Sequence, residues 1–214
     1  MPVTEFDEIM MSSSGSGFHN AKQEPTGYVN YWGYGPSYLY AVKTAYASRE
    51  TMSAEGEFKT LVKELHKAGI ECIPEMYFTG KELPGEILSV LRYWVEEYHV
   101  DGFHLTGFPD LSLAAEDPFL KRTKLFAENW NDVMNRRPKQ GYVTPGDGAV
   151  SVEEKNLAEY NMQFMEDMRR FLKGDEGMLS AFEFRNRRNP AEYAVIDYMA
   201  NTNGFTLMDT VSYD

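Results

Sequence analysis

The sequence predicts an α/β fold built around a parallel β-sheet. Helical and strand-like segments alternate along the chain, and glycines that end helices are followed within one or two residues by apolar strands. Parallel strands joined in this way need right-handed crossovers. Several strands close on a polar residue at their carboxyl end, and that edge carries the ligand site in β/α barrels and in doubly wound sheets.

Apolar residues at helical spacing predict three helices. The clearest covers 57–68, where apolar residues fall at i, i+3, i+4 and i+7 from Phe58, and Gly69 ends the helix. The same pattern predicts helices over 86–98 and 156–172. Residues 111–120 are helical in part. Four apolar runs predict strands, over 70–78, 100–105, 123–128 and 193–200.

Two segments near the start of the chain predict loops. Residues 12–27 are polar and lack an apolar period, so we expect a long loop there. Residues 28–46 are rich in aromatic side chains and contain Gly33, Gly35 and Pro36, which predicts a structured loop. The strand ends that follow would bring four polar residues to one edge of the sheet: Glu75, Thr106, Glu128 and Asn203.

Composition limits the possible partners and cofactors. The 214 residues carry a formal net charge of −12, which argues against binding nucleic acid or an anionic membrane. The single cysteine, Cys72, excludes a disulfide framework and fits a reducing compartment, and the first residues lack a signal pattern, so we expect a cytoplasmic protein. There is no glycine-rich nucleotide loop and no histidine pair for zinc, so neither cofactor nor metal is expected.

The block Asn30-Tyr31-Trp32-Gly33-Tyr34 resembles the Tyr-Trp-Gly-Tyr block of debranching enzymes in the α-amylase family, a group that includes isoamylase, pullulanase and glycogen debranching enzyme. Six more segments resemble these enzymes in the correct order: 1–7, 57–69, 93–103, 123–128, 168–175 and 204–213. The resemblance implies one TIM-type (β/α) barrel domain over 1–214, holding strands two to seven of eight. It also implies a family activity on α-1,6 and α-1,4 glucosidic bonds.

Catalytic positions carried over from the family are mostly altered in this chain. Retaining glycosidases need a nucleophilic carboxylate and a carboxylic acid about 5 Å apart. Glu128 keeps the general-acid position, whereas Thr106 stands in place of the nucleophilic Asp and His104 in place of the neighbouring Arg. Thr202 and Asn203 replace the His-Asp pair that holds the third carboxylate. Aromatic and polar side chains in the matching segments are expected to bind sugar: Tyr31, Trp32, Tyr34, Glu75, His104, Trp130 and Thr202.

Three interpretations follow from this pattern. The first is a family member that has lost hydrolysis and keeps α-glucan binding or a structural role, with missing barrel segments or another chain needed to complete it. The second is an active glycosidase whose carboxylates are relocated, with Glu75 and Glu128 acting across the wider spacing of about 6.5–9.5 Å that inverting chemistry tolerates. The third is a reduced gene product without activity.

Overall fold

The structure is a computed structural model, and it divides into two compact units. It describes residues 2–14, 22–48, 53–130, 156–188, 190, 193–200 and 208. Unit 1 comprises Met1–Asp101 and Leu105–Asp110, and unit 2 comprises Gly102–His104 and Leu111–Asp214. Among the described residues, no helix combines the length and the apolar character needed to cross a bilayer.

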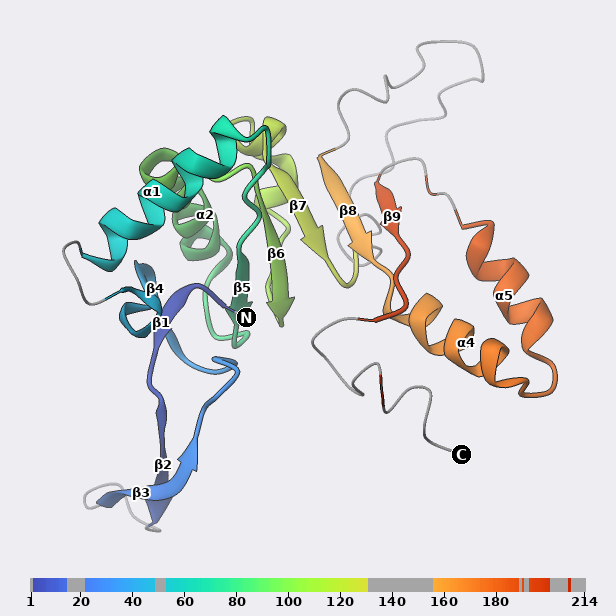
Figure 1. Ribbon diagram of the computed structural model, residues 1–214, viewed down its shortest axis with the longest axis horizontal. Helices are drawn as coiled ribbons and strands as arrows, with labels where there is room; N and C mark the ends of the chain where they lie inside the picture. Colours follow the sequence, from blue (N-terminus) through green and yellow to red (C-terminus); the bar gives the residue numbers. More distant parts are fainter. Residues whose placement is uncertain are drawn as a thin grey trace. The chain divides into compact units, whose positions relative to one another are not determined.

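Four strands come first along the described chain, and helices and further strands follow in mixed order (Figure 1). The strands are β1 (Thr4–Phe6), β2 (Ile9–Ser14), β3 (Lys22–Val29), β4 (Ser37–Val42), β5 (Glu75–Phe78), β6 (Gly102–Gly107), β7 (Lys124–Ala127), β8 (Leu157–Tyr160) and β9 (Ala194–Ile196). The helices are α1 (Ala54–Lys67), α2 (Pro84–Tyr98), α4 (Met162–Lys173) and α5 (Met178–Asn186). Short 3-10 turns are η1 (Thr44–Tyr46), η2 (Ala114–Glu116) and η3 (Leu120–Arg122).

The central element is a five-stranded parallel sheet in the order β5-β6-β7-β8-β9. Its strands follow one another in chain order, so each is hydrogen-bonded to the next one along the sequence. Leu125 lies opposite Leu157 where β7 meets β8, and Ala158 lies opposite Ala194 where β8 meets β9. The predicted α/β class with a parallel sheet is therefore confirmed, and the strands predicted at 100–105, 123–128 and 193–200 correspond to β6, β7 and β9.

In unit 1, α1 and α2 pack beside β4 (Figure 1). Trp94 of α2 is completely buried, and its indole Nε1 donates a hydrogen bond to the Leu39 carbonyl of β4 over 2.7 Å. The ring of Phe58 on α1 meets the Trp94 ring edge-on with 5.6 Å between centroids. The helices predicted at 57–68 and 86–98 are thus confirmed, because their apolar faces supply this core.

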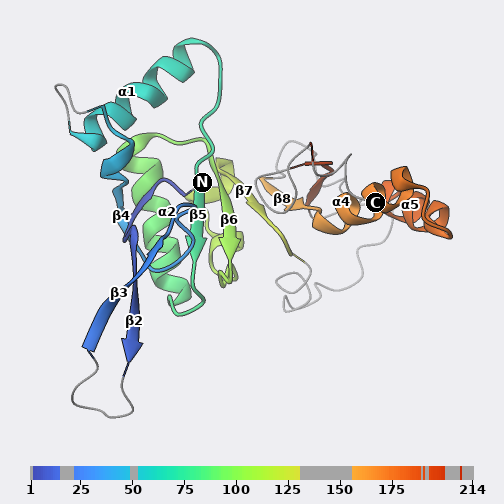
Figure 2. The ribbon, with the colours of Figure 1, turned by 60° about the horizontal axis from the view of Figure 1, so that its bottom comes forward.

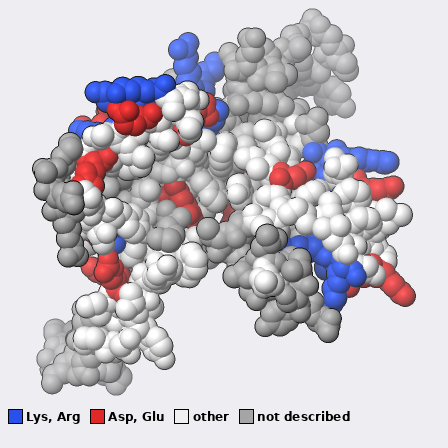
Figure 3. Space-filling view, viewed as in Figure 1, with Lys and Arg blue, Asp and Glu red and all other residues white. Residues whose placement is uncertain are grey.

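The solvent side of α1 carries paired charges. Lys67 forms an ion pair with Glu64 on the same helix, and Lys59 pairs with Glu97 of α2. Figure 3 shows Lys and Arg side chains next to Asp and Glu side chains at the upper left of the molecule. Ser53 caps the start of α1, since its side chain accepts a hydrogen bond from the Gly56 amide over 3.2 Å.

The prediction of a loop over 12–27 is wrong for the described part of that segment. β2 and β3 form an antiparallel hairpin in which Ser12 lies opposite Glu24 and Ile9 opposite Val29. Figure 2 shows this hairpin reaching away from α1 and α2 within unit 1. Backbone hydrogen bonds between two chain segments need no apolar period, so polarity alone does not exclude a strand pair.

The helix predicted over 156–172 begins later than expected. Residues Leu157–Tyr160 form β8, which is held between β7 and β9, and α4 starts only at Met162. Asn161 separates the two elements, because its side chain accepts a hydrogen bond from the Phe164 amide and caps α4. Pairing on both sides of a short apolar run therefore overrides its helical spacing.

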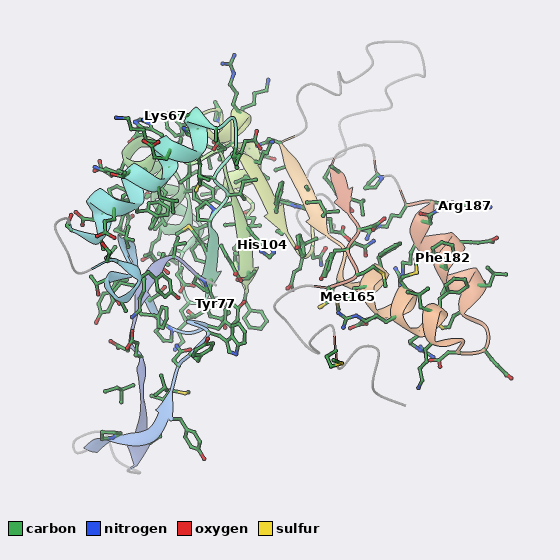
Figure 4. The ribbon with its side chains drawn as sticks, viewed as in Figure 1. Lys67, Tyr77, His104, Met165, Phe182 and Arg187 are labelled. Atoms are coloured by element: carbon green, nitrogen blue, oxygen red, sulfur yellow. The ribbon has the colours of Figure 1, made fainter. Side chains whose placement is uncertain are left out.

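Two further elements differ from the expectation. α5 was not predicted, and it packs against α4 through Phe171 and Phe182, whose stacked rings lie 4.9 Å apart (Figure 4). The partly helical stretch expected at 111–120 consists of the short 3-10 turns η2 and η3. The aromatic segment 28–46 contains strand β4 as well as turns.

A buried ion pair joins β1 to the end of β4 in unit 1. Lys43 is only 3% exposed, and its ammonium contacts Glu5 at 2.8 Å, Glu8 at 3.0 Å and the Phe6 carbonyl at 2.9 Å. Burial alone would raise the pKa of Glu5, but hydrogen bonds from Lys43 and Thr44 outweigh burial and lower that pKa to about 2. The Glu5 carboxylate is therefore a stabilising acceptor at neutral pH.

Replacing Lys43 with Met should lower the free energy of unfolding at pH 7 by about 3 kcal/mol, because it leaves partly buried carboxylates without their cation. A carboxyl whose folded pKa is lowered stabilises the protein above its ordinary pKa of 4.5 and loses that contribution as the pH falls towards about 2. Between these pH values, the free energy of unfolding of the variant should therefore fall less steeply with decreasing pH than that of the wild type. Urea unfolding at several pH values measures both effects.

Lys67→Met is the matched control, since Lys67 pairs with Glu64 on an exposed helix face. We expect it to leave stability nearly unchanged. Equal losses in the two variants would contradict the assignment of a stabilising role to the buried pair.

Candidate functional site

Tyr31 and Trp32 form an exposed aromatic pair in unit 1. Tyr31 is 69% exposed and Trp32 46%, and their rings meet edge-on with 5.3 Å between centroids. Gly33 makes the turn that follows: its φ of +77° is a left-handed conformation, and a Cβ there would lie 2.5 Å from the Phe6 ring. Only glycine fits this turn, and the turn follows directly after the two exposed rings.

Tyr34 points to a different place, the first residues of β5. Its hydroxyl donates a 2.9 Å hydrogen bond to Glu75 Oε1, and its ring lies 5.4 Å from the ring of Tyr77. Glu75 and Tyr77 share one face of β5 because side chains alternate along a strand. Tyr77, which is labelled in Figure 4, was not among the predicted site residues, although this alternation would have identified it. We call Tyr34, Glu75 and Tyr77 the β5 cluster.

Glu75 does not close its strand as the sequence suggested. β5 begins at Glu75 and ends at Phe78, so Glu75 lies at the amino end and Thr79 follows the carboxyl end. The preceding residues of the predicted strand 70–78 lack strand geometry. The turn after β5 is held by Glu82. Its carboxylate accepts hydrogen bonds from the Thr79 amide, the Thr79 hydroxyl and the Gly80 amide.

Thr106 lies near the carboxyl end of β6, as predicted, but it is almost completely buried. Its side chain is 6% exposed, and its hydroxyl donates to the Met76 carbonyl over 3.3 Å. The next residues close over this position, because the Phe108 amide donates to the Phe78 carbonyl over 3.0 Å. A neutral, hydrogen-bonded hydroxyl in this setting supplies no negative charge for covalent or electrostatic catalysis at a sugar carbon.

Glu128 follows directly after β7, in unit 2. The side chain is exposed, yet the protein around its carboxyl removes part of the surrounding water and thereby raises its pKa. A raised carboxyl pKa is the direction that a general acid needs, since the group must hold its proton near the working pH.

An aromatic stack lies on the same unit. The ring of His104 on β6 is 4.4 Å from that of Tyr160 on β8, and the Tyr160 ring is 4.3 Å from that of Tyr198. Burial, together with nearby Tyr160 and Glu128, raises the pKa of Tyr198 to about 12. His104 therefore lies at one end of a stack with Tyr160 and Tyr198, two further site residues that the sequence did not indicate.

The remaining predicted site residues divide into one that is buried and two that are not described. Trp130 is completely buried, and its indole donates to the Ala158 carbonyl over 2.9 Å, so here its ring packs in the core rather than facing a ligand. An aromatic residue after a strand end looks the same in sequence whether it faces solvent or core. Thr202 and Asn203 lie outside the described residues.

The site residues therefore form separate groups with different chemistry. Unit 1 offers exposed rings and the β5 cluster, and unit 2 offers one carboxyl with a raised pKa beside an aromatic stack. Rings and carboxylates together suit the apolar faces and hydroxyls of sugars. In the part of the chain described by the structure, no three His, Cys, Asp or Glu side chains gather closely enough to hold a metal ion.

Comparison with known proteins shows a clear relationship. No family model matches the chain. It is 29% identical to "Isoamylase 3, chloroplastic" of Oryza sativa subsp. japonica, with 100% of this chain and 34% of that protein covered. It is also 29% identical to "Glycogen debranching enzyme" of Serratia proteamaculans, with 87% of this chain and 37% of that protein covered. The chain thus spans about a third of the length of these curated relatives.

Solved structures give the same picture for the fold. The pullulanase SAP of Group B Streptococcus matches with a TM-score of 0.63 and 16% identity, covering 99% of this chain and 34% of that chain. The apo pullulanase of Paenibacillus barengoltzii matches with a TM-score of 0.55 and 16% identity, covering 84% of this chain and 38% of that chain. At this level of identity the likeness concerns the fold alone.

Gly107→Ala should destabilise the carboxyl end of β6 by about 2–4 kcal/mol. Gly107 has a φ of +83°, and a Cβ there would lie 2.1 Å from the Phe78 carbonyl oxygen, so both the backbone and the neighbouring strand would have to move. Thermal unfolding followed by circular dichroism measures the loss. Gly85→Ala on α2 is the control, since a Cβ there meets nothing within 4 Å. A Gly107→Ala protein as stable as that control would argue against this close strand approach.

Proposed function

Because the chain is related to the debranching-type glycoside hydrolases of the α-amylase family, we propose that it is a glucan-binding barrel segment in which hydrolysis has been lost. The ligand is an α-glucan such as glycogen, starch or pullulan. The proposed loss of hydrolysis rests on Thr106, to which the resemblance gives the family's nucleophile position and whose hydroxyl is buried and bonded to the Met76 carbonyl.

The parallel sheet supports the proposed (β/α) barrel architecture. Five strands in chain order, with helices between several of them, fit strands three to seven of such a barrel, and β1 fits the second. A barrel of eight strands usually takes about 250 residues, so further segments or another chain would supply the remaining strands. Residues 1–214 then belong to one domain type throughout.

Binding of α-glucan rests on the exposed rings of unit 1. Tyr31 and Trp32 offer two adjoining aromatic surfaces, and the β5 cluster adds a carboxylate oriented by a tyrosine hydroxyl. Such rings cover the apolar faces of sugars, while carboxylates accept hydrogen bonds from hydroxyls. The Group B Streptococcus pullulanase SAP has a structure in complex with maltotetraose, which makes this oligosaccharide a suitable probe for this chain.

The raised pKa of Glu128 favours the alternative function, an active glycosidase. It would use Glu128 as acid and Glu75 as its partner carboxylate. Glu75 already accepts a hydrogen bond from Tyr34, which would orient its carboxylate. Activity and binding measurements on the same samples separate this alternative from the glucan-binding proposal.

A cytoplasmic location is part of the proposal, and the single thiol supports it. Cys72 is 9% exposed, and burial, followed by the charge of Asp101, raises the pKa of its thiol. A buried thiol of this kind fits a reducing compartment such as the cytoplasm.

Release of reducing sugar from pullulan and from glycogen should not exceed that of the Glu128→Gln variant. Loss of a covalent nucleophile costs several powers of ten in rate, and Thr106 supplies no substitute. Turnover that disappears in Glu128→Gln would contradict the proposal and support the active alternative. Glu75→Gln then serves to identify the second carboxylate.

Trp32→Ala should weaken maltotetraose binding about fivefold to tenfold, because it removes an exposed ring that stacks on sugar. Isothermal titration calorimetry measures the affinity. Tyr38→Ala is the control, since Tyr38 is 63% exposed on β4 and lies outside the Tyr31–Trp32 pair. Equal affinity in the two variants would show that sugar does not stack on Trp32.

A further inference from the structure

Unit 2 contains a cavity of about 670 Å³ formed by the ends of β7 and β8, the start of α4 and the end of α5. Its volume lies in the range of about 300–1,000 Å³ typical of small-molecule sites. Glu128, Asn129 and Gln163 line it with groups that can exchange hydrogen bonds with hydroxyls. None of the unit 1 residues discussed above contributes to it.

The cavity wall is fixed by a buried polar network. Glu159 is only 4% exposed, and both of its carboxylate oxygens accept hydrogen bonds from the guanidinium of Arg188. Arg188 also donates to the Tyr193 hydroxyl over 3.0 Å. Bidentate pairing of this kind holds both side chains in one geometry. The side chains of this wall are therefore held in place without a ligand.

The charges of the lining indicate what kind of ligand it suits. The lining contains two carboxyls, those of Glu128 and Glu159, and two guanidiniums, those of Arg185 and Arg188. Arg188 is neutralised by Glu159, and Arg185 donates through Nε to Asp167 over 2.8 Å. A phosphate site needs unpaired positive charge, and both guanidiniums of the lining are already paired. The lining instead suits a neutral ligand with many hydroxyls.

One rim of the cavity is an exposed aromatic ring. Phe184 is 67% exposed, and the guanidinium of Arg185 lies over its ring, 5.5 Å from the centroid. Its neighbour Phe182, by contrast, is stacked on Phe171 between the two helices (Figure 4). Phe184 therefore presents a flat apolar surface to solvent beside polar groups, which is the combination that a sugar ring requires.

We propose that this cavity is a second α-glucan site, in which Phe184 stacks on a glucosyl ring and Gln163 and the Arg185 guanidinium bind hydroxyls. The inference rests on the proposed function, because it takes α-glucan as the ligand of the chain. It adds to that function a site in unit 2 that shares no residue with the Tyr31–Trp32 pair or the β5 cluster.

Calorimetric titration of the full chain with maltotetraose tests the proposal. The wild-type chain should bind two equivalents, Trp32→Ala should weaken one site about fivefold to tenfold, Phe184→Ala should weaken the other to a similar extent, and the double variant should weaken both. Gln163→Ala should weaken the cavity site about fivefold without removing it. Leu179→Ala is the matched control, since Leu179 is 60% exposed on α5 and lies outside the cavity lining. Circular dichroism checks that each variant folds.

Each result is decisive for one of the two proposals. If wild type binds one equivalent and Phe184→Ala leaves its affinity unchanged while Trp32→Ala weakens it, the cavity inference is overturned and glucan binding stands. If maltotetraose does not bind at all, the proposed function fails. If inorganic phosphate displaces maltotetraose from the Trp32→Ala protein, the assignment of a neutral ligand is overturned.

Discussion

The register between β5 and β6 determines which side chains of β5 are buried in unit 1 and which remain available to a site. The Asp101 amide donates to the Cys72 carbonyl and the Phe108 amide to the Phe78 carbonyl, which fixes how the two strands run beside each other. With side chains alternating along each strand, this register assigns Met76 to the buried core and leaves Tyr77 available beside Tyr34. A slip by one residue would exchange these roles.

The same constraint explains how a catalytic position becomes a structural one. A parallel sheet buries its strands on both faces, and a residue near a strand end is exposed only if the following loop turns away. Here the chain after β6 returns against β5 through Gly107, so Thr106 is enclosed and bonded to backbone. In unit 2, by contrast, the chain leaves β7 with Glu128 still accessible. The two strand ends thus keep different degrees of access to solvent.

Sequence patterns predicted the elements that depend on the spacing of apolar residues. They failed for elements that depend on pairing between strands. Helical spacing identified α1 and α2, and the order of segments identified the parallel sheet. The hairpin over β2 and β3 and the short strand β8 escaped prediction, because hydrogen bonding to a neighbouring strand leaves no period in so few residues. The same limit applies to the site. The sequence gives the residue types of Glu75 and Trp130, but the strand end at which Glu75 lies and the burial of Trp130 depend on packing.

The enclosed thiol of Cys72 makes the chain convenient for spectroscopy. A buried thiol with a raised pKa reacts slowly with maleimides and iodoacetamides, which attack the thiolate. Because this cysteine is the only one in the sequence, a new cysteine on either unit accepts a fluorophore selectively without first removing the native residue. A fluorophore can therefore be attached to either unit in separate variants while the core around Cys72 stays unchanged.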